Sequence, residues 1–131
     1  MTDRRVTLVL DASAIVAYTR HETALHVGDV LIQVLEDNAT AVLPAACLTE
    51  AAPAVADSDL LDVLISHEVT TVLADGETMW RDVAAMAEVT GRADAASAAL
   101  AAIDFGANVL TRTPGLYAGI GKRRMVIEIP G

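Results

Sequence analysis

The sequence is poor in aromatic and sulfur-containing side chains. Only 3% of its 131 residues are aromatic, and Cys47 is its single cysteine. One cysteine excludes an internal disulfide and a cysteine-rich zinc site. Because 53% of the residues are nevertheless hydrophobic, the core must consist mainly of alanine, valine, leucine and isoleucine. We expect Cys47 to be a small core residue on a helix.

The chain also lacks an excess of positive charge and any long apolar run. Its formal net charge of −9 argues against a general nucleic-acid binder, which needs a basic face. The charge leaves open an enzyme that acts on nucleic acid through bound metal, and it would suit a basic protein partner. No apolar run approaches the ~18 residues of a membrane span. The start of the chain makes a poor signal peptide, because Asp11 interrupts its apolar run, so we expect a cytoplasmic protein.

Segments typical of strands and of helices alternate along the chain. The expected strands are residues 5–10, 40–43, 69–73, 108–111 and 125–129. The expected helices are residues 12–19, a stretch that follows 21–23 and runs to about 35, and then 45–56, 58–66, 77–91 and 94–106. Strands separated by helices indicate parallel pairing with right-handed crossovers. We therefore predict an α/β fold, a three-layer α/β/α sandwich with a mainly parallel sheet of about five strands, in one domain spanning residues 1–131.

Local signals mark several boundaries of these elements. Asp57 or Ser58 is suited to cap the helix that follows it, and Gly91 and Gly106 are suited to terminate helices. We expect Trp80 in the core or in a dimer contact, because a lone aromatic side chain on a helix is usually buried. The basic segment 122–124 is expected to form an exposed turn that could contact an RNA backbone.

Three acidic residues stand where solvation alone does not explain them. Asp11 ends the first predicted strand, and Glu50 lies on a predominantly apolar helix. Asp94 begins an alanine-rich helix that must be largely buried. In a parallel sheet, the carboxyl ends of strands and the amino ends of the following helices share one edge. Asp11 and Asp94 can therefore converge there, and Glu50 can reach the same crevice.

Oxygen ligands without histidine or sulfur suit Mg²⁺ or Mn²⁺. Carboxylates crowded together repel, so a bound cation would stabilise the cluster. A bound ion can also activate water and stabilise charge on a phosphoryl oxygen, as a metal-dependent phosphodiesterase requires. The alternative is structural: Asp11 and Asp94 each precede a helix, and an aspartate cap contributes ~1 kcal/mol. Glu50 would then belong to a solvated stripe.

The order of these motifs resembles the PIN-domain family, particularly the VapC-type toxins of bacterial toxin–antitoxin pairs. The segments that carry the resemblance are Leu8–Val16, Leu48–Ala52, Arg92–Ala101 and Ala107–Arg112, which span essentially the whole chain. The resemblance implies a ribonuclease selective for single strands that uses one or two Mg²⁺ or Mn²⁺ ions.

Within that resemblance, Asp11, Glu50 and Asp94 match the metal-binding catalytic acids, and Ser13 matches a hydroxyl that orders the site. It also implies an RNA substrate, a homodimer, and inhibition by a small antitoxin that inserts a side chain into the site.

The chain departs from the family at one position. A fourth acid usually follows Thr-Arg, and this chain reads Thr111-Arg112-Thr113. Threonine is neutral and binds a hard cation weakly, so Thr111 and Thr113 are expected to support the site and not to replace the missing acid. Two hypotheses follow: an active endoribonuclease, or a catalytically weakened PIN-like protein that binds a partner.

Overall fold

Five parallel strands form one sheet in the order β3-β2-β1-β4-β5 in the computed structural model, which describes residues 4–74, 76, 79–120 and 125–130. The strands are β1 (Arg5–Leu10), β2 (Ala39–Pro44), β3 (Thr70–Leu73), β4 (Asn108–Thr111) and β5 (Val126–Glu128). Each predicted strand is present, with ends within two residues of the prediction. The central strands β1, β2 and β4 supply the buried residues, and the two edge strands are more exposed.

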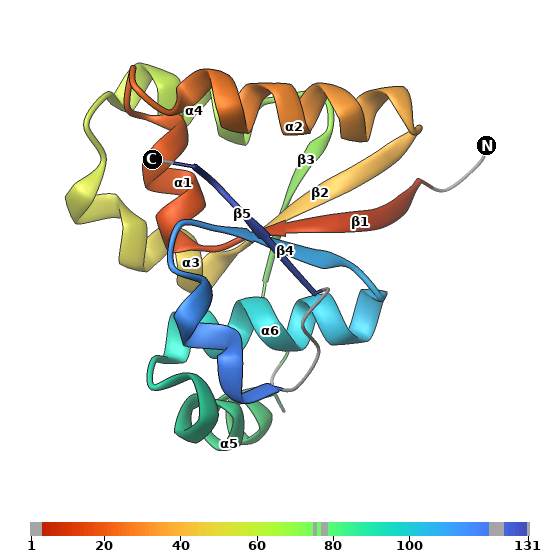
Figure 1. The fold of residues 1–131 in the computed structure, drawn as a ribbon, viewed down its shortest axis with the longest axis vertical. Coiled ribbons are helices and arrows are strands. Elements are labelled where there is room, and N and C mark those ends of the chain that lie inside the picture. Colours follow the sequence, from red (N-terminus) through yellow and green to blue (C-terminus); the bar gives the residue numbers. More distant parts are fainter. Residues whose placement is uncertain (1–3, 75, 77–78, 121–124, 131) are drawn as a thin grey trace.

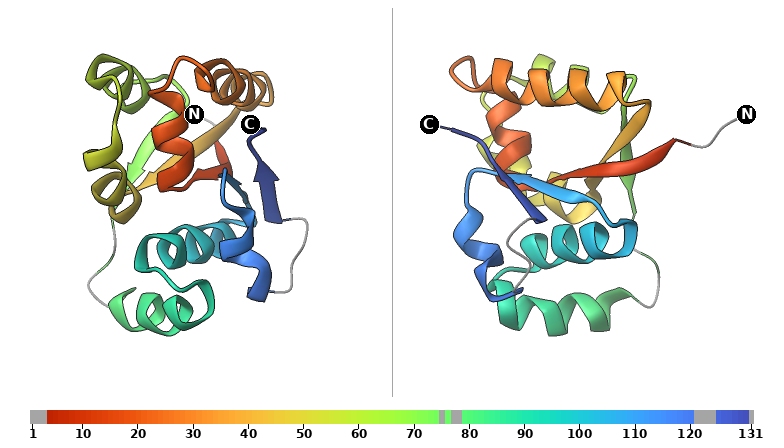
Figure 2. Two further views of the ribbon diagram at one scale, coloured as in Figure 1. Left: turned by 60° about the vertical axis from the view of Figure 1, so that its left-hand side comes forward. Right: turned by 45° about the vertical axis from the view of Figure 1, so that its right-hand side comes forward.

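Helices cover both faces of the sheet (Figure 1), as the predicted three-layer sandwich requires. On one side lie α1 (Ala12–Tyr18), α2 (Ala24–Glu36) and α4 (Ser58–Ile65). On the other lies α6 (Ala93–Phe105), with α5 (Met79–Thr90) packed outside it (Figure 2). The helix α3 (Ala45–Ala51) and the 3₁₀ helix η1 (Ala52–Ala54) follow β2, and a second 3₁₀ helix, η2 (Pro114–Ile120), follows β4.

Helix α6 is buried nearly all round because it lies between the sheet and α5. Its run of alanines lets the neighbouring elements approach closely, and a helix that is apolar on all sides is typical of such a central position. The burial predicted for this helix is confirmed. It ends as predicted at Gly106, whose φ of +66° lies in the left-handed region that glycine adopts most easily.

Some predicted boundaries are wrong for identifiable reasons. The helix predicted over residues 45–56 gives way to η1 after Ala51, because Pro53 has no backbone N–H to continue an α-helix. Helix η2 was not predicted from its mixed sequence. The predicted start of the helix at residues 77 and 78, and the predicted basic turn at 122–124, lie outside the described residues.

The core placement predicted for Trp80 is wrong, and the dimer contact offered beside it stays a prediction. Its side chain is 64% exposed, and the guanidinium of Arg81 lies over its ring at 5.1 Å from the centroid. The placement predicted for Cys47 is confirmed, since it is fully buried on α3. Among the described residues, no helix is long and apolar enough to cross a membrane.

The strand order reverses direction at β1, which lies between β2 and β4. The chain leaves β1 for one side of the sheet and returns through α6 to the other side. In open parallel sheets, ligands bind in the crevice outside the carboxyl ends of the strands at such a reversal. Asp11 follows the end of β1 and Thr111 ends β4, with Leu10 paired to Leu110 just before them. The topology therefore predicts a ligand site at this edge, at the carboxyl ends of β1 and β4.

Candidate functional site

A cavity of about 480 Å³ lies at the carboxyl end of β1 and β4. The acids Asp11, Glu50 and Asp94 all line it, although they come from three distant parts of the chain. Ser13 and Thr113 line it as well, whereas Thr111 lies behind them as a fully buried residue. The structure thus brings the predicted acids to one cavity.

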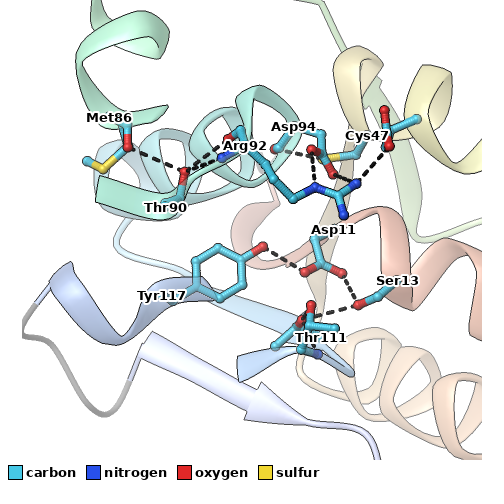
Figure 3. A network of polar contacts seen from close by, with 11 residues as sticks. Asp11, Ser13, Cys47, Met86, Thr90, Arg92, Asp94, Thr111 and Tyr117 are labelled. Atoms are coloured by element: carbon cyan, nitrogen blue, oxygen red, sulfur yellow. Dashed lines mark hydrogen bonds and ion pairs between the residues drawn. The ribbon is translucent and has the colours of Figure 1, made fainter. Parts of the chain in front are cut away.

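Asp11 lies at the buried end of this cavity, with only 2% of its surface exposed. Three donors hold its carboxylate. The Ser13 hydroxyl at 2.6 Å binds Oδ1 and the Tyr117 hydroxyl at 2.6 Å binds Oδ2 (Figure 3). The Ala14 backbone N–H also binds Oδ1, at 3.0 Å. The Ala14 bond caps α1, so the capping role predicted for Asp11 is confirmed. Capping uses one of the three donors, and the other two come from side chains.

The hydroxyls beside Asp11 form a chain whose direction follows from their proton count. Each hydroxyl has one proton, and the carboxylate only accepts, so Ser13 must give its proton to Asp11. Thr111, 3.1 Å from Ser13, must then donate to it, and Thr113, 3.2 Å from Thr111, donates in turn. The Arg112 and Thr113 backbone N–H groups donate to Ser13 Oγ and Thr111 Oγ1, at 2.8 and 2.9 Å.

Thr113, at the position where the PIN-domain resemblance expects a fourth acid, takes part in this hydrogen-bond network. Thr113 is the outer end of a hydroxyl chain that leads through Thr111 and Ser13 to Asp11. A hydrogen-bonded chain of this kind polarises each member in the same direction. The supporting role expected for Thr113, Thr111 and Ser13 therefore has a geometric basis.

Tyr117 was not identified from the sequence, although it contacts Asp11 directly. It lies on η2 with 4% of its surface exposed. Burial, and then the neighbouring negative charge and hydrogen bond of Asp11, raise the pKa of Tyr117 well above its ordinary value, so the phenol stays a donor. A Cβ on Gly119 would lie 3.0 Å from Val89 Cγ1, so glycine there allows η2 to lie close against α5. This packing helps to place the Tyr117 ring.

Glu50 and Asp94 face the more open part of the cavity and share a single cation, Arg92. The Arg92 Nε and Nη2 atoms lie 3.0 and 3.3 Å from Oδ1 and Oδ2 of Asp94, and Nη2 lies 2.7 Å from Glu50 Oε1. The Arg92 and Glu50 side chains are 46% and 54% exposed, whereas that of Asp94 is 10% exposed. The capping alternative for Asp94 is wrong: Arg92 holds the N-cap position of α6, and the Asp94 carboxylate pairs with it.

The hydrogen bond and charge of Asp94, together with the charges of Glu50 and Asp11, raise the pKa of Arg92 despite an opposing effect of burial. Its backbone is fixed by Thr90, whose hydroxyl donates to the Arg92 carbonyl at 2.9 Å. The Cys47 thiol donates to the Asp94 carbonyl at 3.2 Å, which ties α3 to the first turn of α6. Arg92, like Tyr117, was not identified as a site residue, and only its place two residues before Asp94 could have suggested a pairing.

The donor chemistry of the three acids fits Mg²⁺ or Mn²⁺, because carboxylate oxygens are the ligands these hard cations prefer. Arg92 pairs with two of them, because its guanidinium binds both oxygens of Asp94 and one of Glu50. Within the described part of the chain, no three His, Cys, Asp or Glu side chains are grouped closely enough to hold one ion. The acids therefore fit a metal by type, and their convergence on one ion requires the guanidinium to move.

No protein-family model matches the sequence, and no curated protein matches it. Among solved structures, the chain is similar to PAE2754 from Pyrobaculum aerophilum, with a TM-score of 0.67 and 21% sequence identity. The match covers 95% of this chain and 92% of that one. A likeness at this identity establishes that the two proteins share a fold.

Proposed function

We propose that the chain is a metal-dependent endoribonuclease of the PIN-domain type, acting as the toxin of a toxin–antitoxin pair. The observation that carries this proposal is the meeting of Asp11, Glu50 and Asp94 in one cavity at the reversal point of the sheet. The three acids come from distant parts of the chain, and a shared cavity is what a metal site built from them requires.

Asp11, Glu50 and Asp94 would hold Mg²⁺ or Mn²⁺ through their carboxylate oxygens. When bound, such an ion lowers the pKa of a water molecule and stabilises charge on a phosphoryl oxygen. The chain's own contribution is to fix the acids: Ser13, Ala14 and Tyr117 hold Asp11 in one orientation. The hydroxyl chain through Thr111 and Thr113 in turn fixes Ser13.

Positive charge at the cavity supports a phosphodiester substrate. Although the chain is acidic overall, Arg20, Arg92 and Arg112 all line this cavity. Arg20 and Arg112 also line a second cavity of about 520 Å³, together with Thr23 and His26. An RNA strand whose scissile phosphate lay near the acids would have a path past these two arginines, which can bind neighbouring phosphates.

The same proposal includes a small antitoxin and a homodimer, in a cytoplasmic setting. Exposed apolar side chains on the outer helices, such as Leu25 and Ile32 on α2 and Trp80 on α5, are compatible with protein contacts.

Cleavage of a labelled single-stranded RNA by the purified chain with Mn²⁺ tests the proposal. Asp11→Asn should lower the cleavage rate at least about a hundredfold, because a neutral amide binds the ion poorly and presents a donor to Ser13 or Tyr117. Asp104→Asn is the matched control: this acid is exposed on α6 outside the cavity lining, so the variant should cleave like the parent. Equal cleavage by the parent and Asp11→Asn would contradict the proposal and point to a contaminating nuclease.

A non-catalytic PIN-like binding protein is the second candidate, and two observations favour it. Thr113 replaces the usual acid, and Arg92 already pairs with two of the three acids. Thr113→Asp distinguishes the candidates. Cleavage that appears only in this variant would identify the natural chain as a pseudoenzyme, whereas cleavage by the parent would exclude that reading.

A further inference from the structure

We propose that Arg92 is a built-in counter-cation which a divalent metal ion must displace from Glu50 and Asp94, so that metal binding and Arg92 pairing exclude each other. This inference rests on the proposed metal-dependent function and concerns how the site becomes loaded. It assigns to Arg92 a role that controls metal affinity.

Arg92 contacts three of the four carboxylate oxygen atoms of Glu50 and Asp94. Its Nε and Nη2 atoms bind both carboxylate oxygens of Asp94, and Nη2 also binds Oε1 of Glu50. A divalent ion held by these two acids would have to take the place of the guanidinium at the Asp94 oxygens. A guanidinium and a metal ion cannot occupy that position together, because both are cations and both need contact with the carboxylates.

The carboxylates of the site repel one another, and either Arg92 or a metal ion must offset that repulsion. Asp11, Glu50 and Asp94 line one cavity, and Asp94 is mostly buried, so unneutralised carboxylates there would repel. In the present arrangement Arg92 supplies one positive charge to Glu50 and Asp94 and offsets part of their repulsion. An incoming ion therefore gains only the difference between its own binding and the Arg92 pairs.

Arg92 is placed so that it can leave while the acids stay. Its guanidinium lies on a half-exposed side chain, and the Thr90 hydroxyl fixes its backbone carbonyl at 2.9 Å. Rotation of the side chain alone can therefore move the cation without disturbing the start of α6, which carries Asp94. Asp11 is held separately by its three hydrogen-bond donors and does not depend on Arg92 for its orientation.

Exchange of this kind has two consequences. Arg92 sets a threshold concentration below which the metal does not load, because the pairing free energy is subtracted from the binding free energy. After exchange, the released guanidinium remains tethered at the same cavity, where it can bind a phosphate oxygen of the substrate.

Titration of Mn²⁺ into the purified full chain, followed by calorimetry, tests the inference. Arg92→Gln removes the cation and should bind Mn²⁺ roughly tenfold more tightly than the parent, since two partly exposed ion pairs no longer compete. Arg92→Lys keeps the charge but loses the planar fork, so its affinity should lie between the two. Arg81→Gln removes the same charge at an exposed position over Trp80 and should match the parent.

A second measurement does not depend on activity. Without metal, Arg92→Gln should unfold at a lower temperature than the parent, because the mostly buried Asp94 loses its partner. Saturating Mn²⁺ should then raise the unfolding temperature of Arg92→Gln by more than it raises that of the parent. A larger rise in the parent would overturn the inference.

The outcomes separate this inference from the proposed function. Equal or weaker Mn²⁺ binding by Arg92→Gln, with RNA cleavage intact, would overturn the counter-cation role and leave the nuclease proposal standing. The predicted order of affinities without any cleavage would contradict the nuclease proposal and support the counter-cation role. Absence of Mn²⁺ binding by every variant would overturn both.

Discussion

The two halves of the candidate site are built in opposite ways. Asp11 is buried, and a serine hydroxyl, a backbone N–H and a phenol bind it, all of them neutral donors from the protein. Glu50 and Asp94 face a half-exposed arginine and are held by ionic contacts. The first half is fixed by hydrogen bonds that water cannot replace, and the second by a cation that another cation can replace.

The Asp11 half therefore contributes stability, and the half that contains Glu50 and Asp94 allows exchange of its cation. Buried donors that lose an acceptor cannot recover it from solvent, so breaking the Asp11 half is costly. Ion pairs open to solvent contribute little, because water and salt compete for the same charges. We therefore expect substitutions in the Asp11 half to lower the free energy of unfolding more than substitutions at Glu50.

Asp11→Ala should have the largest effect on folding. It removes the cap of α1 and leaves the Ser13 and Tyr117 hydroxyls without their acceptor, at a combined cost of about 3 kcal/mol in the free energy of unfolding. Urea denaturation followed by circular dichroism measures this change. A loss as small as that of an exposed acid such as Asp104→Ala would show that the Asp11 half is not a stabilising network.

Tyr117→Phe should have an intermediate effect that depends on pH. Loss of the hydrogen bond to Asp11 should cost about 1.5 kcal/mol at neutral pH. Because the pKa of Tyr117 is raised above its ordinary value of 10.0, its contribution is fully present below that pH and is lost as the pH rises above it.

The parent should therefore lose stability between about pH 8 and pH 11 more steeply than Tyr117→Phe does. Urea midpoints at the two pH values provide the comparison. Parallel loss of stability by the parent and the variant would contradict the assignment of alkaline sensitivity to this phenol.

Glu50→Gln should have the smallest effect on stability. Its side chain is 54% exposed and makes one ion pair with Arg92, so the change in unfolding free energy should stay below about 0.5 kcal/mol. The same urea measurement tests it, and added salt should reduce the difference further. A cost comparable with that of Asp11→Ala would remove the distinction between the two halves.

Much of the fold could be predicted from the sequence because its elements are strongly patterned. The alternation of short β-branched runs with apolar helices gave the five-strand sheet and its two helical layers, and the glycines gave the ends of α5 and α6. The boundary predictions were wrong at Pro53 and at η2. Both 3₁₀ helices depend on local hydrogen bonding, which hydrophobic periodicity does not report. Trp80 was misplaced because the usual burial of aromatic side chains does not say which face of a particular helix meets the core.

The acids of the candidate site were identifiable from sequence because each stands in a context that simple solvation does not explain. Their partners were not. Tyr117 is 106 positions from Asp11 along the chain, and Arg92 is 42 from Glu50, so no local pattern links these pairs. Their contacts arise only when η2, which follows β4, comes beside the end of β1 and when α3 meets the start of α6.

The sequence was sufficient to predict a parallel α/β sheet with three acids at its carboxyl edge, because strand and helix periodicity and the position of each acid are local properties of the chain. The groups that bind each acid could be known only from the folded structure. Hydrogen bonds and ion pairs depend on distances of a few ångströms between remote segments. In this fold, hydroxyl groups donate to Asp11, and Arg92 pairs with Glu50 and Asp94.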